Sequence, residues 1–200
     1  LEEKYYRKAE IEKKNGGMRE ILIPAMKLRI VQRWILKNIL YNIRVSDYAM
    51  GFRKKYSIAT NAKIHTGKKC VVNMDLKDFF PSITQKQVFQ IFYYYGYTID
   101  VSYLLSRLCT HEGRVPQGAP TSPYLSNIIC LKLDKRLSKL AEKYEADYTR
   151  YADDITFSGE AGLKSIILRV KEIIEDEGFV VNEKKTRIQF DYQGQEVTRN

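Results

Sequence analysis

Two adjacent aspartates, Asp153 and Asp154, lie between two short segments of strand-forming residues. Residues 148–152 and 155–158 are rich in aromatic and β-branched side chains, so they predict two strands joined by a tight turn at the aspartate pair. Strands joined by so short a turn must run antiparallel. No other feature of the chain constrains the fold as strongly.

A third β-branched segment, residues 70–76, predicts a buried strand, and Pro81 prevents its continuation. Asp75 lies at the end of this segment, where a charge is costly to bury. If the three strands belong to one sheet, they could bring Asp75 beside Asp153. Asp75 could also be a helix cap or a surface residue at a strand end, and Asp78 is a competing candidate in the same segment.

The other segments predict helices and further strands around these three. Thr84 and Gln87 form a capping box for a helix that ends at Gly96. The order of elements predicts an α+β fold, an antiparallel sheet backed by helices, after a smaller N-terminal lobe. The expected helices are 26–43, 85–96, 101–109, 122–143 and 163–177. The further strands are expected at 19–23, 179–181 and 186–192. A turn is expected at 15–17, an irregular basic segment at 46–67 and a loop at 112–123.

The composition favours a binding partner with many phosphates. The net charge is +10 and the pI is about 9.4, which suits a protein that binds a nucleic-acid backbone, although a solvated basic surface is the alternative. The apolar runs are too short to span a bilayer, and the charged N-terminus does not resemble a signal peptide. Three widely spaced cysteines without a CxxC pair predict reduced core residues in a cytoplasmic protein rather than a zinc site.

The aspartate pair has two interpretations. Asp is common in solvated turns, but a two-residue hairpin turn usually contains Gly or Asn, and neither is present here. Adjacent like charges beside a core strand repel each other unless a cation neutralises them. Carboxylate oxygens suit Mg²⁺, so Asp75, Asp153 and Asp154 predict a site for divalent metal ions.

A loop with three prolines, residues 115–123, contains the tripeptide Pro116-Gln117-Gly118. A glycine between prolines lets the backbone approach a ligand closely, and Gln117 can both donate and accept hydrogen bonds. An ordinary loop is the alternative for this segment taken alone.

In combination, these segments resemble the reverse transcriptases. Residues 75–81 are similar to the first palm motif of that family, residues 116–118 to its nucleotide-pocket loop, and residues 151–154 to its catalytic turn. Lys184-Lys185 resembles the later palm motif whose lysine lies near the incoming phosphates, and Arg19 the fingers arginine that contacts the triphosphate. The resemblance covers nearly the whole chain.

Among reverse transcriptases, the chain most resembles the bacterial retron enzymes. Residues 61–65 match their NAxxH motif, which makes Asn61 and His65 candidates for RNA binding, and residues 148–154 are typical of them. Val197-Thr198 matches the start of their VTG motif, but Arg199 stands in place of the glycine.

The resemblance implies the fingers and palm of a right-hand polymerase, with fingers at 1–68, palm at 69–200 and a fingers insert near 82–115. A retron enzyme would normally continue into a thumb domain, which we expect to be absent from these residues. It implies DNA synthesis from deoxynucleoside triphosphates on an RNA template, extending a DNA or RNA primer with Mg²⁺ or Mn²⁺. A structured noncoding RNA, an effector protein and a role in antiviral defence follow from the retron likeness, and no membrane is implied. The implied roles are Asp75, Asp153 and Asp154 as catalytic metal ligands, Phe80 under the nucleotide sugar, Gln117 and Gly118 around the nucleotide, and Arg19 and Lys185 on its phosphates.

Three alternatives stay open at this stage. A group II intron-like or other bacterial reverse transcriptase would differ in partner and primer. An RNA-directed RNA polymerase shares the carboxylates, but the bulky Phe80 favours DNA synthesis. A non-catalytic RNA-binding scaffold would have lost a carboxylate, whereas this chain has all three.

Overall fold

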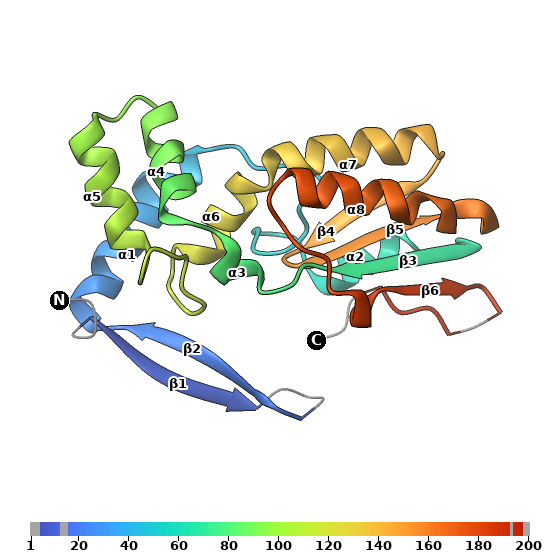
Figure 1. The fold of residues 1–200 in the computed structure, drawn as a ribbon, viewed down its shortest axis with the longest axis horizontal. Helices are drawn as coiled ribbons and strands as arrows, with labels where there is room; N and C mark the ends of the chain where they lie inside the picture. Colours follow the sequence, from blue (N-terminus) through green and yellow to red (C-terminus); the bar gives the residue numbers. More distant parts are fainter. Residues whose placement is uncertain (1–4, 13–15, 193, 198–200) are drawn as a thin grey trace. The chain divides into compact units, whose positions relative to one another are not determined.

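The computed structural model describes residues 5–12, 16–192 and 194–197. The chain forms two compact units, each built from two separate stretches of sequence (Figure 1). Unit 1 comprises Leu1–Arg44 and Phe80–Ile129, and unit 2 comprises Val45–Phe79 and Cys130–Asn200. Compactness alone does not assign the names fingers and palm, so the expected assignment of 1–68 and 69–200 stays a prediction.

Unit 1 combines a hairpin with a group of helices. Its hairpin is antiparallel and pairs Glu12 with Met18, as the glycines after Asn15 predicted; Asn15 itself lies outside the described residues. Helices α4 and α5 pack against each other, and the Thr84–Gln87 capping box at the start of α4 is confirmed. The elements of this unit are β1 (Tyr6–Glu12), β2 (Met18–Pro24), α1 (Met26–Asn38), η1 (Leu40–Asn42), α4 (Gln85–Tyr94), α5 (Ile99–Cys109) and α6 (Ser122–Ile129), with α3 (Phe79–Ser82) at the boundary between the units.

Unit 2 is a four-stranded antiparallel sheet with helices packed against it. The strand order is β4-β5-β3-β6, and α7 packs on both α8 and β4, as Figure 1 illustrates. This arrangement confirms the predicted α+β class and the antiparallel pairing of the strands around the aspartates. The elements are α2 (Ile58–Ile64), β3 (Cys70–Asp75), α7 (Leu131–Lys143), β4 (Asp147–Tyr151), β5 (Asp154–Gly159), η2 (Ala161–Ser165), α8 (Ile166–Asp176), η3 (Glu183–Lys185) and β6 (Arg187–Phe190).

The central strand of unit 2 packs in an apolar core, beside which several buried polar side chains also lie. Val71, Val72 and Met74 of β3 are buried, as expected for a central strand. Helix α8 buries residues four apart, which is the spacing of one helix face. These contacts fix β3 and β5 in register and therefore fix the ends of both strands.

Several predicted boundaries are wrong, each for a local reason. The expected helix 122–143 is two helices, because Cys130 has a ψ of 2° between them. The segment expected to be irregular contains α2, whose start is capped by the Ser57 hydroxyl accepting from the Thr60 amide at 3.2 Å. Residues 179–181 form a single bridge, Val181 to Leu76, rather than a strand.

Smaller differences concern where elements begin and end. Helix α1 ends at Asn38, five residues before the predicted end, and the chain continues as the 3₁₀ turn η1. The helix expected at 163–177 starts as the 3₁₀ segment η2. The three cysteines are buried and unpaired, as predicted. Within the described ranges, no helix combines the length and apolar character needed to cross a membrane.

Candidate active site

The pairing of β3 with β5 brings carboxylates from distant parts of the sequence together. Asp75, the last residue of β3, is the Cα partner of Asp154, the first residue of β5. Asp153 precedes Asp154, and its backbone carbonyl accepts a hydrogen bond from the Leu76 amide at 3.0 Å. The sequence prediction that Asp75 lies beside the aspartate pair is therefore confirmed at the level of the backbone.

The turn itself differs from the prediction by one residue. Tyr151 pairs with Asp154, so the two-residue loop is Ala152-Asp153 and not Asp153-Asp154. Ala152 has a φ of 58°, in the left-handed region that favours glycine at this turn position. A non-glycine residue held there stores about 1–3 kcal/mol of backbone strain, a feature that recurs at functional sites.

Asp75 is buried, with 5% of its surface exposed, and it is held by two neighbours. Lys185 donates to one carboxylate oxygen at 2.7 Å, and the Asn182 side-chain amide donates to the other at 3.1 Å. The backbone amide of Asn182 also donates to the Asp75 carbonyl at 2.7 Å. The segment after α8 therefore places the ammonium group of Lys185 and the side-chain amide of Asn182 at the end of β3.

The carboxylates repel one another. Burial, together with the negative charges of Asp153 and Asp75, raises the pKa of Asp154 to about 7. Lys185 and Arg187 act in the opposite direction but do not cancel this effect. A bound cation would relieve the repulsion, and hard oxygen donors match the preference of divalent ions such as Mg²⁺. The donor chemistry thus fits such an ion.

The side chains are not arranged as a closed ligand set. Within the part of the chain that the structure describes, no group of three His, Cys, Asp or Glu side chains is positioned to hold a metal ion. The ammonium group of Lys185 lies 2.7 Å from one carboxylate oxygen of Asp75. Asp78, the competing candidate, is exposed and has a φ of 47°.

Unit 1 contains the other candidate residues. Gln117 accepts a hydrogen bond from the Leu22 amide at 2.8 Å through its backbone carbonyl, so the proline-rich loop lies against β2, the strand that carries the exposed Arg19. Gly118 has a φ of 121°, and a Cβ atom there would lie 2.6 Å from the Ile21 side chain. The sequence predicted that this glycine lets the backbone approach a ligand closely. In the structure, the backbone at Gly118 closely approaches β2 of the same unit.

Phe79 and Phe80 have different surroundings. Phe79 is buried and its ring lies 5.8 Å from that of Phe179, while Phe80 is partly exposed at the start of α3. The structure therefore assigns Phe79 to the core of unit 2.

Asn61 and His65 are both buried, with at most 1% of their surface exposed. The two ring nitrogens of His65 hydrogen-bond with the hydroxyls of Ser158 and Thr149, each at 2.7 Å. These two bonds connect His65, at the end of α2, to β5 and β4. Neither the Asn61 nor the His65 side chain has an exposed surface that RNA could contact in this structure.

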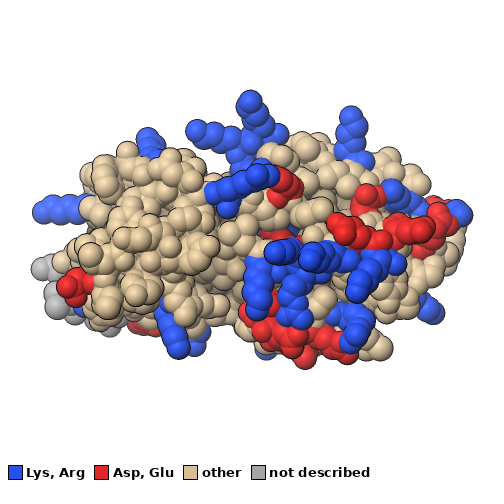
Figure 2. Space-filling model, turned by 90° about the horizontal axis from the view of Figure 1, so that it is seen from above, with Lys and Arg blue, Asp and Glu red and all other residues tan. Residues whose placement is uncertain are grey.

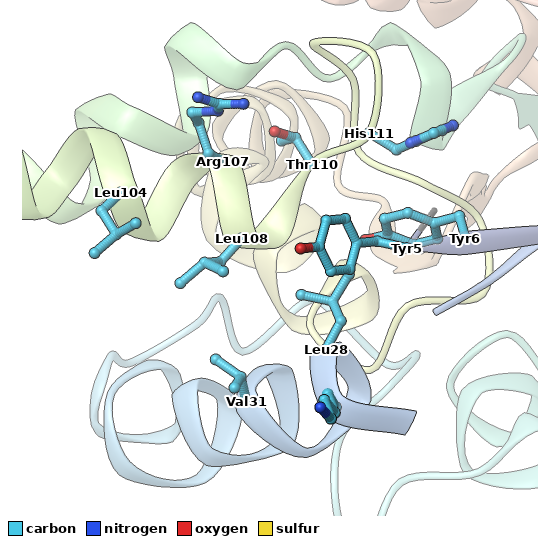
Figure 3. A pocket seen from close by; sticks show the side chains of 10 residues that line it. Tyr5, Tyr6, Leu28, Val31, Leu104, Arg107, Leu108, Thr110 and His111 are labelled. Atoms are coloured by element: carbon cyan, nitrogen blue, oxygen red, sulfur yellow. The ribbon is translucent and has the colours of Figure 1, made fainter. Parts of the chain in front are cut away.

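Unit 1 also has a pocket of about 370 Å³ that sequence analysis did not anticipate (Figure 3). Leu28 and Val31 of α1 face Leu104 and Leu108 of α5 across it, and Tyr5 lies at one end. Its lining comes from the start of the hairpin, α1, α5 and the residues just after α5. The loop with Gln117 and Gly118 lies elsewhere in the unit.

Two further residues near the turn were also missed. Arg150 and Asp134 form a fully buried ion pair below the turn. The available signal was the charge at position 150 in an otherwise strand-forming segment, which requires a buried partner.

On the surface, Lys and Arg side chains crowd part of the face seen in Figure 2, beside a smaller acidic group.

Comparisons with known proteins agree on the kind of protein. Residues 11–197 match the family described as reverse transcriptase (RNA-dependent DNA polymerase). The retron Ec86 reverse transcriptase of Escherichia coli is 43% identical over 92% of this chain and 58% of its own length. The retron Mx162 reverse transcriptase of Myxococcus xanthus is 40% identical over 89% of this chain and 43% of its own. The chain thus spans about half the length of the relatives it matches.

The fold is similar to that of solved telomerase structures. A Candida tropicalis telomerase truncated from its C-terminal domain superimposes with a TM-score of 0.63, over 96% of this chain and 51% of that one. A Candida albicans telomerase in complex with a fragment of telomeric RNA gives a TM-score of 0.62, over 95% and 43%. Sequence identities of 13% and 10% make this a likeness of fold alone.

Proposed function

This chain belongs to the reverse transcriptase family, as its motifs predicted, and we propose that the protein is an RNA-directed DNA polymerase of the retron type. The observation that carries the proposal is the pairing of Asp75 with Asp154 across β3 and β5, with Asp153 in the adjoining turn. A fold that brings the backbones of three aspartates together from positions 78 and 79 residues apart in sequence, at the cost of mutual repulsion, has a use for a cation there.

Enzymes of this family use divalent metal ions, and we assign Mg²⁺ to this protein, with Mn²⁺ as a substitute. When bound, the ions would activate the primer 3′-hydroxyl and stabilise the leaving pyrophosphate. Asp75, Asp153 and Asp154 would hold them. In the structure, the ammonium group of Lys185 neutralises Asp75. Once a metal ion takes its place on the carboxylate, this ammonium group would instead neutralise the phosphates of the nucleotide.

For unit 1, the proposal rests on the resemblance of its motifs. Gln117 and Gly118 would shape the nucleotide pocket, Phe80 would lie under the sugar, and Arg19 would contact the triphosphate. The backbone bond between Gln117 and Leu22 supports a rigid loop beside the strand of Arg19. Unit 1 would then correspond to the fingers, and unit 2 to the palm.

The proposed partners are an RNA template, a DNA or RNA primer and deoxynucleoside triphosphates. The net charge of +10 supports binding to a phosphate backbone. The similarity to enzymes named as retron reverse transcriptases supports a structured noncoding RNA, an associated effector protein and a role in antiviral defence. The buried, unpaired cysteines suit a cytoplasmic location.

The test is primer extension on an RNA template by the full-length protein and its aspartate variants. Asp153→Asn and Asp75→Asn should each reduce kcat by about a hundred-fold or more, because the metal ions supply several kcal/mol. Asp153 supports the sheet through its backbone carbonyl, which the amide variant keeps. Asp78→Asn is the matched control, since Asp78 is exposed and Asn tolerates its left-handed backbone.

The expected pattern is loss of extension in the two site variants, retained melting temperatures, and near wild-type extension in the control. Extension at wild-type rate by either site variant would show that the metal site is elsewhere. No extension by the wild-type protein would favour the non-catalytic scaffold. A branched RNA–DNA molecule that copurifies with the protein would identify the retron type, and a linear product primed on an intron or another RNA would favour the other bacterial enzymes.

A further inference from the structure

A buried ion pair lies below the turn that carries Asp153. The guanidinium group of Arg150 in β4 donates to both carboxylate oxygens of Asp134 in α7, from Nε at 2.7 Å and from Nη2 at 2.8 Å. The hydroxyl of Tyr148 donates to the same carboxylate at 2.7 Å. Arg150 and Asp134 are both 0% exposed. The pair is therefore removed from water and held in one geometry.

The third nitrogen of the guanidinium group connects this pair to the turn. Nη1 of Arg150 donates to the backbone carbonyl of Ala152 at 3.0 Å. This carbonyl belongs to the peptide group that joins Ala152 to Asp153, and Ala152 is the residue with a φ of 58°. A charge-assisted bond to that oxygen sets the orientation of the peptide plane. The orientation of the plane in turn sets the direction in which the Asp153 side chain leaves the backbone.

The opposite side of the turn is also fixed. The backbone of Arg150 bonds with that of Tyr48 at 2.9 Å and with that of Met50 at 2.7 Å, so residues 48–50 cover the outer edge of β4. The next residue, Gly51, lies so close to the turn that a Cβ atom there would be 2.9 Å from the Ala152 nitrogen. The backbone of the turn is confined on both sides.

Stability alone does not explain a buried pair of this kind. The desolvation of two charges offsets most of their attraction, and apolar residues of similar volume often give equal or greater stability. The geometry specifically requires arginine, because only a guanidinium group can donate hydrogen bonds to a carboxylate from two nitrogens and to a carbonyl from the third. The arrangement suits a device that fixes a strained backbone in one conformation.

We propose that Arg150 and Asp134 are positioning residues for the catalytic carboxylates: the pair holds the Ala152–Asp153 peptide so that Asp153 points to the metal site. This inference rests on the proposed function and deepens it. Neither side chain touches substrate or metal in this account. Their effect passes through the backbone of the turn to the Asp153 carboxylate.

The experiment compares variants of the full-length protein in three measurements: melting temperature, Mn²⁺ affinity by electron paramagnetic resonance, and kcat and KM for primer extension. Arg150→Lys keeps the charge but cannot serve both Asp134 and the Ala152 carbonyl. Tyr148→Phe is the matched control, because it removes one bond to Asp134 and leaves the bond to Ala152 intact. A triple variant, Arg150→Met with Asp134→Leu and Tyr148→Phe, replaces the whole network by apolar side chains.

We expect Arg150→Lys to lower kcat by about ten-fold or more and to weaken Mn²⁺ binding several-fold, with KM for the template-primer nearly unchanged. Tyr148→Phe should change each of these by less than about three-fold. The triple variant should melt near the wild-type temperature and still show the loss of kcat. Adding Ala152→Gly to Arg150→Lys should restore part of the rate, because glycine adopts the positive φ without strain.

Three results would overturn the proposal. One is wild-type kcat and Mn²⁺ affinity in a folded triple variant. Another is an equal loss in Arg150→Lys and Tyr148→Phe, which would indicate a general packing role. The third is a Mn²⁺ affinity that stays at the wild-type value in both variants that replace Arg150. If the wild-type protein extends no primer, the proposed polymerase function fails, while the Mn²⁺ affinities still decide whether the pair positions Asp153.

Discussion

Acidification should destabilise unit 2 through His65. The imidazole ring is 1% exposed, and its two nitrogens hydrogen-bond with Ser158 and Thr149. One hydroxyl donates to the unprotonated nitrogen and the other accepts from the N–H group, so the neutral ring satisfies both. Burial lowers the pKa of His65 from 6.5 to about 4; Asp147 raises it and Lys68 lowers it to a smaller extent.

The sign and size of the effect follow from this pKa. The unfolded chain binds a proton near pH 6.5, whereas the folded protein does so only near pH 4. Stability contributed by His65 is therefore complete above pH 6.5 and is lost as the pH falls toward 4. The gap between the two pKa values, at 1.36 kcal/mol per pH unit, amounts to about 3 kcal/mol. At pH 5 the loss should already be about 2 kcal/mol.

The assay is urea unfolding, followed by circular dichroism at pH 7.5 and pH 5, for the wild-type protein and His65→Gln. The glutamine side chain can hydrogen-bond with either hydroxyl but does not titrate. Asp154, whose pKa is raised to about 7, titrates in the same range in both proteins, so the informative quantity is the difference between the two pH dependences. We expect the wild-type protein to lose about 2 kcal/mol more than the variant between these pH values. Equal pH dependences would refute the neutral, buried state of His65.

Three further predictions concern nucleotide choice, backbone strain and charge. Phe80→Ala should raise the kcat/KM of a ribonucleotide relative to a deoxynucleotide by roughly a hundred-fold, because a phenyl ring that excludes a 2′-hydroxyl is worth a few kcal/mol. Phe79→Ala should instead destabilise the fold by about 3–5 kcal/mol, since its ring packs on Phe179, and an unchanged nucleotide ratio in Phe80→Ala would remove Phe80 from the sugar site. Gly118→Ala should lower the melting temperature and raise KM for the nucleotide; Gly113→Ala, which also has a positive φ but no atom within 4 Å of its added Cβ, controls for strain alone. Residues 1–200 should bind an RNA–DNA hybrid weakly, with log Kd rising linearly with log salt concentration, and binding that is tight and insensitive to salt would contradict the role given to the net charge of +10.

The parts of the fold that sequence predicted are those set by local physics. The β-branched run of β3 and the capping box at Thr84 need only neighbouring residues, and both are confirmed. The strand-forming segments on either side of Asp153 and Asp154 predicted a hairpin, and the pairing of β4 with β5 confirms it. The proximity of Asp75 to the pair followed from these strands because strands of one sheet align their ends.

The register and the turn were beyond the reach of pattern alone. A hairpin turn with positive φ normally contains glycine, so a turn at Ala152-Asp153 contradicts local preference. Tertiary contacts override that preference here, from Arg150 on one side and from Gly51 on the other. Neither contact leaves a periodic pattern in the sequence, and the predicted turn was therefore displaced by one residue.

The polar residues of β4 show why the remaining site residues were missed. Tyr148 and Arg150 point to one face of the strand and bond to Asp134 of α7, whereas Thr149 points to the other face and bonds to His65 after α2. The alternation of β4 thus separates two polar networks on opposite faces of a buried strand. A charged residue in such a strand predicts that a partner of opposite sign exists, but the chain offers 24 acidic residues and the sequence does not select among them. Only the packing of α7 on β4 makes Asp134 that partner and connects it, through Arg150, to the backbone of the turn that carries Asp153.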